Sequence, residues 1–170
     1  ILGLALQTYA YTQSSGWGLQ VSKLFRGLDP SEKAGPSYRL GMGIAKLIAE
    51  SELSIPWLLH VDPLIRSGVV KLQPGSAARG DLVGTDVNFD WHAFEAKGRT
   101  HWPPSSLVKK AKTQAQRIAL VNGKKPKTHC ACLTTLISRP IQVQLIDPRG
   151  ANPDDRLDLQ IDIEGFFREY

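Results

Sequence analysis

The chain has little cysteine, no long apolar run and no internal repeat. Its two cysteines, Cys130 and Cys132, lie two apart in an apolar segment. We therefore expect small buried thiols in a reducing, cytoplasmic compartment rather than a disulfide. His129 adjoins them, but no second ligand pair follows at zinc-site spacing, so we do not expect a zinc site. No stretch approaches the roughly 18 apolar residues of a membrane span, which argues against a membrane protein.

The opening segment ILGLALQTYAY is too short to span a membrane, and it has neither a basic leader nor a small-residue cleavage site. It does not predict a signal peptide. The chain starts at Ile1 rather than Met, which we interpret as a piece of a longer protein. Its 170 residues, 42% of them hydrophobic, are enough for one domain with its own core. We expect that core at about 38–147, with 1–37 and 148–170 as peripheral extensions.

Positive charge is modest overall, with a formal net charge of +5, but it is concentrated in one segment. Between Lys109 and Lys127 there are seven basic residues and no acidic one. Such a segment suits a polyanionic partner such as nucleic acid. The alternative is a solvated helix face followed by a basic turn. The candidate nucleic-acid contacts are Arg99, Lys109, Lys110, Lys112, Arg117, Lys124 and Lys125.

Pro, Gly and Ser cluster at 27–37, 74–80, 98–106 and 148–153, and the segments between these breaks show regular patterns. Apolar spacing predicts one helix over 38–53, capped by Ser37, and a second from Ser105 or Ser106 to about Val121. The predicted strands are 55–61, 81–87, 91–97, 129–138 and 141–147, and the last alternates like a half-exposed edge strand. Alternation also occurs at 157–163 in the tail. The order α-β-β-β-α-β-β predicts an α/β sandwich, with a mixed central β-sheet flanked by helices.

The tripeptide Glu95-Ala96-Lys97 is the strongest candidate for a functional site. On a strand, Glu95 and Lys97 project from the same face, and burying both is unfavourable unless they meet a metal or a charged substrate. Asp81, on the neighbouring strand, would complete an oxygen-ligand site for a hard divalent cation. On an unbroken strand Asp86 points to the opposite face, so Asp81 is the expected ligand, and Asp86 is the alternative if Gly84 marks a bulge. Mg²⁺ fits best, with Mn²⁺ as a substitute, and the chemistry is that of phosphodiester cleavage.

The order of elements and the position of these residues resemble the PD-(D/E)XK nuclease superfamily, which has the restriction-endonuclease-like fold. The resemblance covers about 38–147. The segment GDLVG supplies the aspartate, with Gly80 where the family often has proline, and FEAKGR supplies the Glu-x-Lys motif. The resemblance implies that Asp81, Glu95 and the carbonyl of Ala96 bind the metal. It also implies that Lys97 lies near the attacked phosphate.

Two further positions follow from the resemblance. The exonuclease branch places a glutamine on the second helix, pointing at the metal, and Gln114 matches it. The tyrosine that follows in that branch is replaced here by Ile118. Some members add a glutamate from the first helix, for which Glu50 and Glu52 are equal candidates. His60, His92 and His101 form no triad with a nucleophile.

We therefore expect a metal-dependent deoxyribonuclease that hydrolyses DNA with an activated water. The alternative is a catalytically inactive nuclease-like domain that binds nucleic acid or scaffolds a larger complex. A third interpretation is an unrelated α/β domain in which Glu-x-Lys is accidental. A homodimer, or further domains of a larger protein, would supply whatever sequence specificity the chain lacks.

Overall fold

The computed structural model describes residues 2–16, 18–75, 78–137, 140–146 and 156–160. The elements, in order, are α1 (Leu2–Tyr11), β1 (Thr12–Ser15), β2 (Gly18–Val21), α2 (Lys23–Gly27), α3 (Ala34–Leu53), β3 (Trp57–His60), α4 (Val61–Arg66), β4 (Val70–Leu72), β5 (Leu82–Thr85), β6 (Trp91–Arg99), α5 (Ser105–Gln116), β7 (Ile118–Val121), β8 (Thr128–Thr135), β9 (Gln142–Ile146) and β10 (Arg156–Gln160). Among the described residues, no helix is long and apolar enough to cross a membrane.

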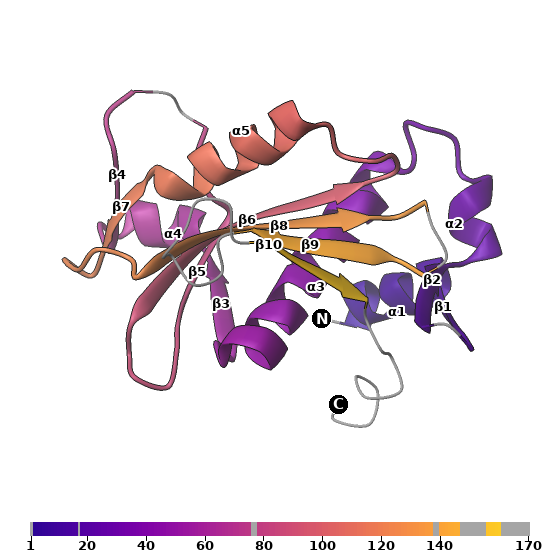
Figure 1. Ribbon diagram of the computed structural model, residues 1–170, viewed down its shortest axis with the longest axis horizontal. Coiled ribbons are helices and arrows are strands. Elements are labelled where there is room, and N and C mark those ends of the chain that lie inside the picture. Colours follow the sequence, from indigo (N-terminus) through magenta and orange to yellow (C-terminus); the bar gives the residue numbers. More distant parts are fainter. Residues whose placement is uncertain (1, 17, 76–77, 138–139, 147–155, 161–170) are drawn as a thin grey trace.

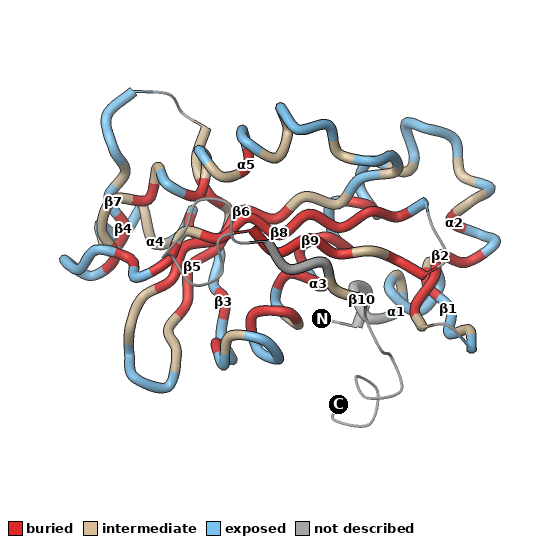
Figure 2. The backbone as a smooth tube through the Cα atoms, viewed as in Figure 1, coloured by how far each residue is buried: buried red, intermediate tan, exposed pale blue. Residues whose placement is uncertain are grey.

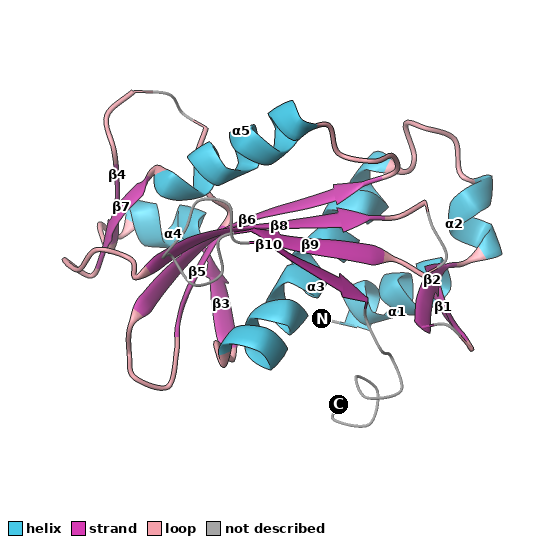
Figure 3. Ribbon diagram, in the orientation of Figure 1, coloured by secondary structure: helices cyan, strands magenta, loops and turns pink. Residues whose placement is uncertain are grey.

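A mixed six-stranded sheet forms the centre of the molecule, in the order β10-β9-β8-β6-β5-β3 (Figure 1). Strands β6 and β8 run parallel, and each of the other neighbouring pairs is antiparallel. A parallel pair needs a crossover connection, and α5 lies in the segment between β6 and β8. Two short ribbons, β1-β2 and β4-β7, lie at opposite ends of the main sheet (Figure 3).

Helices α3 and α5 cover opposite faces of the sheet (Figure 1). Successive residues of a strand point to opposite faces, so β6 contributes to both layers. Phe94 and Ala96 join the large core cluster with α3, whereas Ala93 packs with Ile118 on the face of α5. The buried residues run along the central strands, and the outer faces of the helices are exposed (Figure 2). Glu95 shares the face of Ala93 and therefore lies on the α5 side.

Two glycines allow α3 to lie directly on β6. A Cβ atom at Gly41 would collide with the backbone of Gly98, and one at Gly98 would collide with the carbonyl oxygen of Ser37. The first turns of α3 are therefore held against the last residues of β6. This contact brings Ser37 and Tyr38 beside the Glu-x-Lys motif.

Strand β6 is longer than its neighbour β5. Strand β5 pairs with Trp91–Phe94, whereas β8 pairs with residues 92–99 of β6. Within the part of the chain that the structure describes, residues 95–99 therefore have a neighbouring strand on one side only. Their other side is an open edge, with backbone N–H and C=O groups directed away from the sheet.

The expected α/β class and the mixed central sheet flanked by helices are confirmed. Three local predictions are wrong. Helix α3 begins at Ala34, so Ser37 lies inside the helix and does not cap it. Helix α5 ends at Gln116, and the segment from Ile118 to Val121 is strand β7. Strand β9 is mostly buried between β8 and β10 and is not an edge strand.

Candidate functional site

Asp81 lies at the open edge of β6, immediately before β5. Its backbone N–H donates to the carbonyl of Phe94 (2.8 Å), and its carboxylate Oδ2 accepts from the N–H of Ala96 (3.1 Å). The N–H and C=O of one strand residue point to the same side of the strand. The carbonyl of Ala96 therefore also faces the edge where Asp81 lies, which brings together two of the three predicted metal ligands.

Glu95, the third predicted ligand, is completely buried, with 0% of its surface exposed. Its carboxylate forms an ion pair with the ammonium group of Lys97, which remains partly exposed. Apart from Lys97, no described group donates a hydrogen bond to either oxygen of Glu95. A buried carboxylate with so few donors is unfavourable unless a cation satisfies it.

Electrostatics at Glu95 follow from this environment. Burial, which is the largest cause, and the negative charge of nearby Asp81 raise the pKa of Glu95, whereas the ion pair with Lys97 lowers it, and the net pKa is about 8. The carboxylate of Asp81 is close enough to Glu95 for its charge to raise the pKa of Glu95. Two acidic groups held this closely favour either a shared proton or a bound cation.

A pocket of about 250 Å³ opens beside Asp81 and is lined also by Gln114 and Tyr38. The side-chain oxygen of Gln114 is buried and has no hydrogen-bond partner among the described residues. The structure therefore brings Gln114 of α5 to the same pocket as Asp81. Burial raises the pKa of the Tyr38 hydroxyl, and the charges of Asp81, Asp62 and Glu95 add to the shift.

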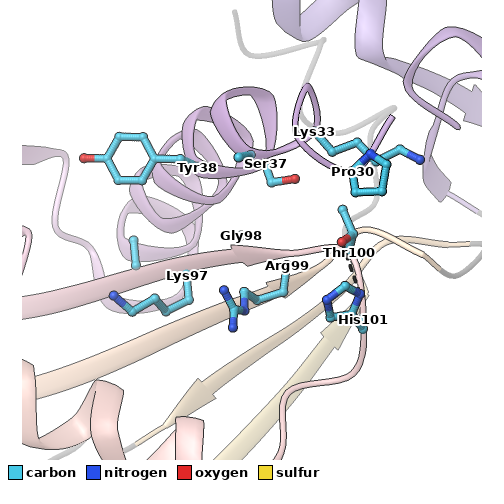
Figure 4. A pocket seen from close by; sticks show the side chains of 11 residues that line it. Pro30, Lys33, Ser37, Tyr38, Lys97, Gly98, Arg99, Thr100 and His101 are labelled. Atoms are coloured by element: carbon cyan, nitrogen blue, oxygen red, sulfur yellow. Dashed lines mark hydrogen bonds between the residues drawn. The ribbon is translucent and has the colours of Figure 1, made fainter. Parts of the chain in front are cut away.

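A second pocket, of about 420 Å³, lies along the open edge of β6, and Tyr38 lines both pockets (Figure 4). Lys97 and Arg99 line the pocket from β6. Ser37 lines it from α3, and Lys33 is the residue immediately before that helix. Among the described residues that line this pocket, Lys33, Lys97 and Arg99 are cationic and none is acidic. The Glu-x-Lys motif thus separates an acidic side, at Asp81, from a basic side, at Arg99.

The oxygen atoms at this site are of the kind that could hold a magnesium ion. Mg²⁺ takes few carboxylates and keeps several waters, so two carboxylates and a main-chain carbonyl are a sufficient protein contribution. The buried oxygens of Glu95, whose charged partner is Lys97, and of Gln114, which has no hydrogen-bond partner among the described residues, fit such an ion. Among the described residues, no group of three or more His, Cys, Asp or Glu side chains is arranged to hold a metal.

The predicted nucleic-acid contacts differ in how far they are exposed. Lys109, Lys110, Lys124 and Lys125 are exposed, the first two on α5 and the others in the turn after β7. The ammonium nitrogen of Lys112 is buried, and burial lowers its pKa. The guanidinium group of Arg117 donates to the carbonyl of Gln73 (3.0 Å) and lies close to Gly75. These two side chains therefore make internal contacts.

Asp86 belongs to a different cluster at the β5–β6 turn. It accepts hydrogen bonds from the N–H groups of Asn88 and Asp90, and its Oδ2 lies 3.4 Å from Nε2 of His92. Nδ1 of His92 lies 2.8 Å from the hydroxyl of Thr128. The alternative aspartate and this histidine therefore stabilise the hairpin, on the face of β6 opposite Glu95.

The two candidate glutamates of α3, the cysteines and His129 also lie outside the site. Glu50 and Glu52 are exposed near the end of α3, and neither lines the two pockets. Burial raises the pKa of Cys130 to about 11 and that of Cys132 to about 12, so both remain thiols at neutral pH. Nε2 of His129 lies 3.0 Å from the carbonyl oxygen of Ile118.

Three residues near the site carry no signal in the sequence. Tyr38 and Ser37 reach it through the Gly41–Gly98 contact, which joins segments more than fifty positions apart. Asp62, at the start of α4, lines the pocket of Asp81 and forms an ion pair with Arg79. Each of these placements depends on packing between elements distant in the chain.

The chain matches no protein-family model, and neither curated proteins nor solved structures gave a match.

Proposed function

We propose that the chain is a metal-dependent nuclease of the PD-(D/E)XK type, which hydrolyses phosphodiester bonds of DNA. The observation that carries the proposal is the burial of Glu95 beside Asp81, with Lys97 as its charged partner. A structural acid in that position would weaken the fold at neutral pH. A cation bound beside Glu95 would give a physical reason for a buried carboxylate at this position. The order α3-β3-β5-β6-α5-β8 also agrees with the core that the resemblance implies.

Asp81, Glu95 and the carbonyl of Ala96 would hold Mg²⁺ or Mn²⁺, which supplies positive charge to polarise the phosphodiester and to acidify the attacking water. Lys97 extends from the same strand face as Glu95 toward the edge. Its ammonium would offset the negative charge that accumulates on the phosphoryl oxygens in the transition state. The amide oxygen of Gln114 would accept a hydrogen bond from a water in the adjoining pocket.

The second candidate is a nuclease-like domain that only binds nucleic acid or scaffolds a complex. The exposed lysines of α5 and of the turn after β7 suit phosphate contacts that position DNA without reading its sequence. Such contacts serve an enzyme and a binding module equally. The complete set of Asp81, Glu95 and Lys97 favours the enzyme, because binding alone does not require a buried carboxylate. The cytoplasmic location and the homodimer stay predictions.

Cleavage assays separate the two candidates. The protein is incubated with plasmid and with linear single- and double-stranded DNA in Mg²⁺, Mn²⁺ or EDTA, alongside Lys97→Ala and Lys46→Ala. Lys46 is exposed on α3 and lines neither pocket, so its replacement is a charge-matched control. Cleavage that needs the metal and is lost only in Lys97→Ala supports the enzyme. Salt-sensitive binding without cleavage supports the binding module, and the absence of both contradicts a nucleic-acid function.

A further inference from the structure

The basic pocket along the open edge of β6 extends beyond the group that would perform cleavage. Lys97 and Arg99 are two residues apart on one strand and therefore point to the same face, about 7 Å apart along the strand. That separation is comparable to the distance between successive phosphates of one nucleic-acid strand. A substrate with one phosphate at Lys97 therefore brings a neighbouring phosphate to Arg99.

Ser37 gives this pocket a buried polar group that lacks a partner. The residue is only 5% exposed, it lines the pocket, and its hydroxyl projects from α3 into the space between that helix and the end of β6 (Figure 4). Its oxygen has no hydrogen-bond partner among the residues that the structure describes. A buried hydroxyl without a partner is unfavourable, and a ligand that accepts its proton removes the penalty.

The remaining contacts show that side chains, rather than the start of the helix, define the pocket. The N–H of Ala34 donates to Ser31, that of Ser37 donates to Lys33, and Pro36 has no N–H. The ammonium of Lys33 donates one hydrogen bond to the carbonyl of Arg26 (3.0 Å). An ammonium has three protons, so Lys33 can also bind an anion.

We propose that this pocket binds the phosphate next to the scissile one, on the same DNA strand, through Arg99, the hydroxyl of Ser37 and Lys33. The proposal rests on the proposed nuclease function, and it assigns the substrate a continuous strand with two adjacent phosphates. The pocket volume of about 420 Å³ accommodates a group of nucleotide size. The neighbouring phosphate is either an internal diester or a terminal monoester, and the two share the same chemistry of recognition.

The test uses Arg99→Ala, Ser37→Ala and the control Arg66→Ala. Arg66 is exposed at the end of α4 and lines neither pocket. Arg99→Ala should lower kcat/KM about tenfold or more, as expected for a charged hydrogen bond, and Ser37→Ala should lower it severalfold. Ser37→Ala should leave the thermal midpoint unchanged or raise it, because the hydroxyl has no partner to lose. A purely structural serine would instead lower the midpoint without weakening DNA binding at temperatures where the protein is folded.

Modified substrates locate the contact. Each of two oligonucleotides carries one uncharged methylphosphonate, either immediately 5′ or immediately 3′ of the cleaved linkage. One of them should slow the wild type about tenfold but leave Arg99→Ala almost unaffected, because the variant has already lost that contact. If Arg99→Ala remains as sensitive as the wild type to both substitutions, the proposal is overturned. Cleavage of circular DNA indicates an internal diester, whereas activity restricted to linear DNA with a terminal phosphate indicates a monoester.

Binding in EDTA distinguishes failure of this proposal from failure of the nuclease function. If the wild type cleaves no DNA with any cation, the affinity of each protein for a short fluorescent oligonucleotide is measured by anisotropy. Binding that is weakened tenfold by Arg99→Ala and severalfold by Ser37→Ala, but not by Arg66→Ala, supports a phosphate pocket in a non-catalytic domain. Equal affinities for the wild type and all three variants contradict the pocket itself.

Discussion

Replacing Glu95 with glutamine should change how the stability of the metal-free protein depends on pH. Burial and the charge of Asp81 raise the pKa of Glu95 from 4.5 to about 8 in the folded protein. Between these two values the folded state binds more protons than the unfolded state, so the free energy of unfolding falls as pH rises. Below pH 4.5 this contribution is fully present, and above about pH 8 it has been lost. The difference in pKa corresponds to a loss of up to roughly 5 kcal/mol.

The assay is denaturant or thermal unfolding in EDTA at several pH values from 5 to 9, for the wild type and Glu95→Gln. Glutamine is uncharged at every pH, so the variant does not undergo this loss. The two proteins should have similar stability near pH 5, and the variant should be several kcal/mol more stable near pH 9. For a chain of this length, that difference raises the thermal midpoint by roughly 10 °C. His92, whose pKa is lowered by burial, acts with the opposite sign but cancels between the two proteins.

Mg²⁺ should narrow the difference in stability between the two proteins at high pH. A metal binds the ionised carboxylate and so stabilises the folded state. At concentrations above Kd, this stabilisation grows with the logarithm of the metal concentration. The wild type should therefore gain stability from Mg²⁺ at pH 8–9 and little at pH 5, and Glu95→Gln should gain little at either pH. A difference between wild type and variant that stays constant from pH 5 to 9 in EDTA would refute the buried-carboxylate reasoning. Stabilisation of both proteins by Mg²⁺ to the same extent would refute Glu95 as a ligand.

Three other predictions concern packing, the choice of aspartate and the DNA contacts. Gly98→Ala should lower the free energy of unfolding by about 1–3 kcal/mol or more, because the added Cβ meets the backbone of α3. The control Gly43→Ala, with nothing near its Cβ, should be neutral or stabilising. Equal denaturation midpoints for the two variants would contradict the close packing. Asp81→Asn should reduce the cleavage rate at least 100-fold and Asp86→Asn only severalfold, and equal losses in a gel assay would contradict the assignment of Asp81. Lys109→Ala should reduce the slope of log DNA affinity against log salt concentration by about one, because Lys109 is exposed. Lys112→Met should leave that slope unchanged, because the Lys112 nitrogen is buried. Equal slopes for the two variants in a salt titration would contradict this difference in exposure.

Periodicity was sufficient to predict the central elements because their patterns are long and regular. The nine-residue strand β6 and the twenty-residue helix α3 both occupy the regions expected for them. The segment from Ile118 to Val121 is different, because four apolar residues after a helix fit either a continued helix or a strand. Its pairing with β4 decides the outcome, and that pairing joins residues almost fifty positions apart. The prediction that β9 is an edge strand is wrong for a similar reason, since the strand that covers its outer side comes from 156–160.

The site was predictable only where it depends on a local pattern. Glu95 and Lys97 share a face because every strand alternates, and Asp81 reaches them because β5 and β6 form a hairpin. Ser37 and Tyr38 come from a helix whose position depends on the contact between Gly41 and Gly98. Neither glycine has a turn or a positive φ that would mark it in the sequence. The basic pocket therefore needed three-dimensional coordinates, although each of its residues is ordinary in the sequence.

The length difference between β5 and β6 is what creates the site. If β5 paired along the whole of β6, the backbone of Ala96 would be used by the sheet, and no carbonyl would remain for a cation. Because β5 pairs only as far as Phe94, the N–H of Ala96 binds the carboxylate of Asp81 instead of a neighbouring strand. An open sheet edge is normally a liability, since it can pair with another chain. Here α3 covers part of the edge and Asp81 occupies the rest, so the groups that protect the edge are also those that would bind the metal and the phosphates.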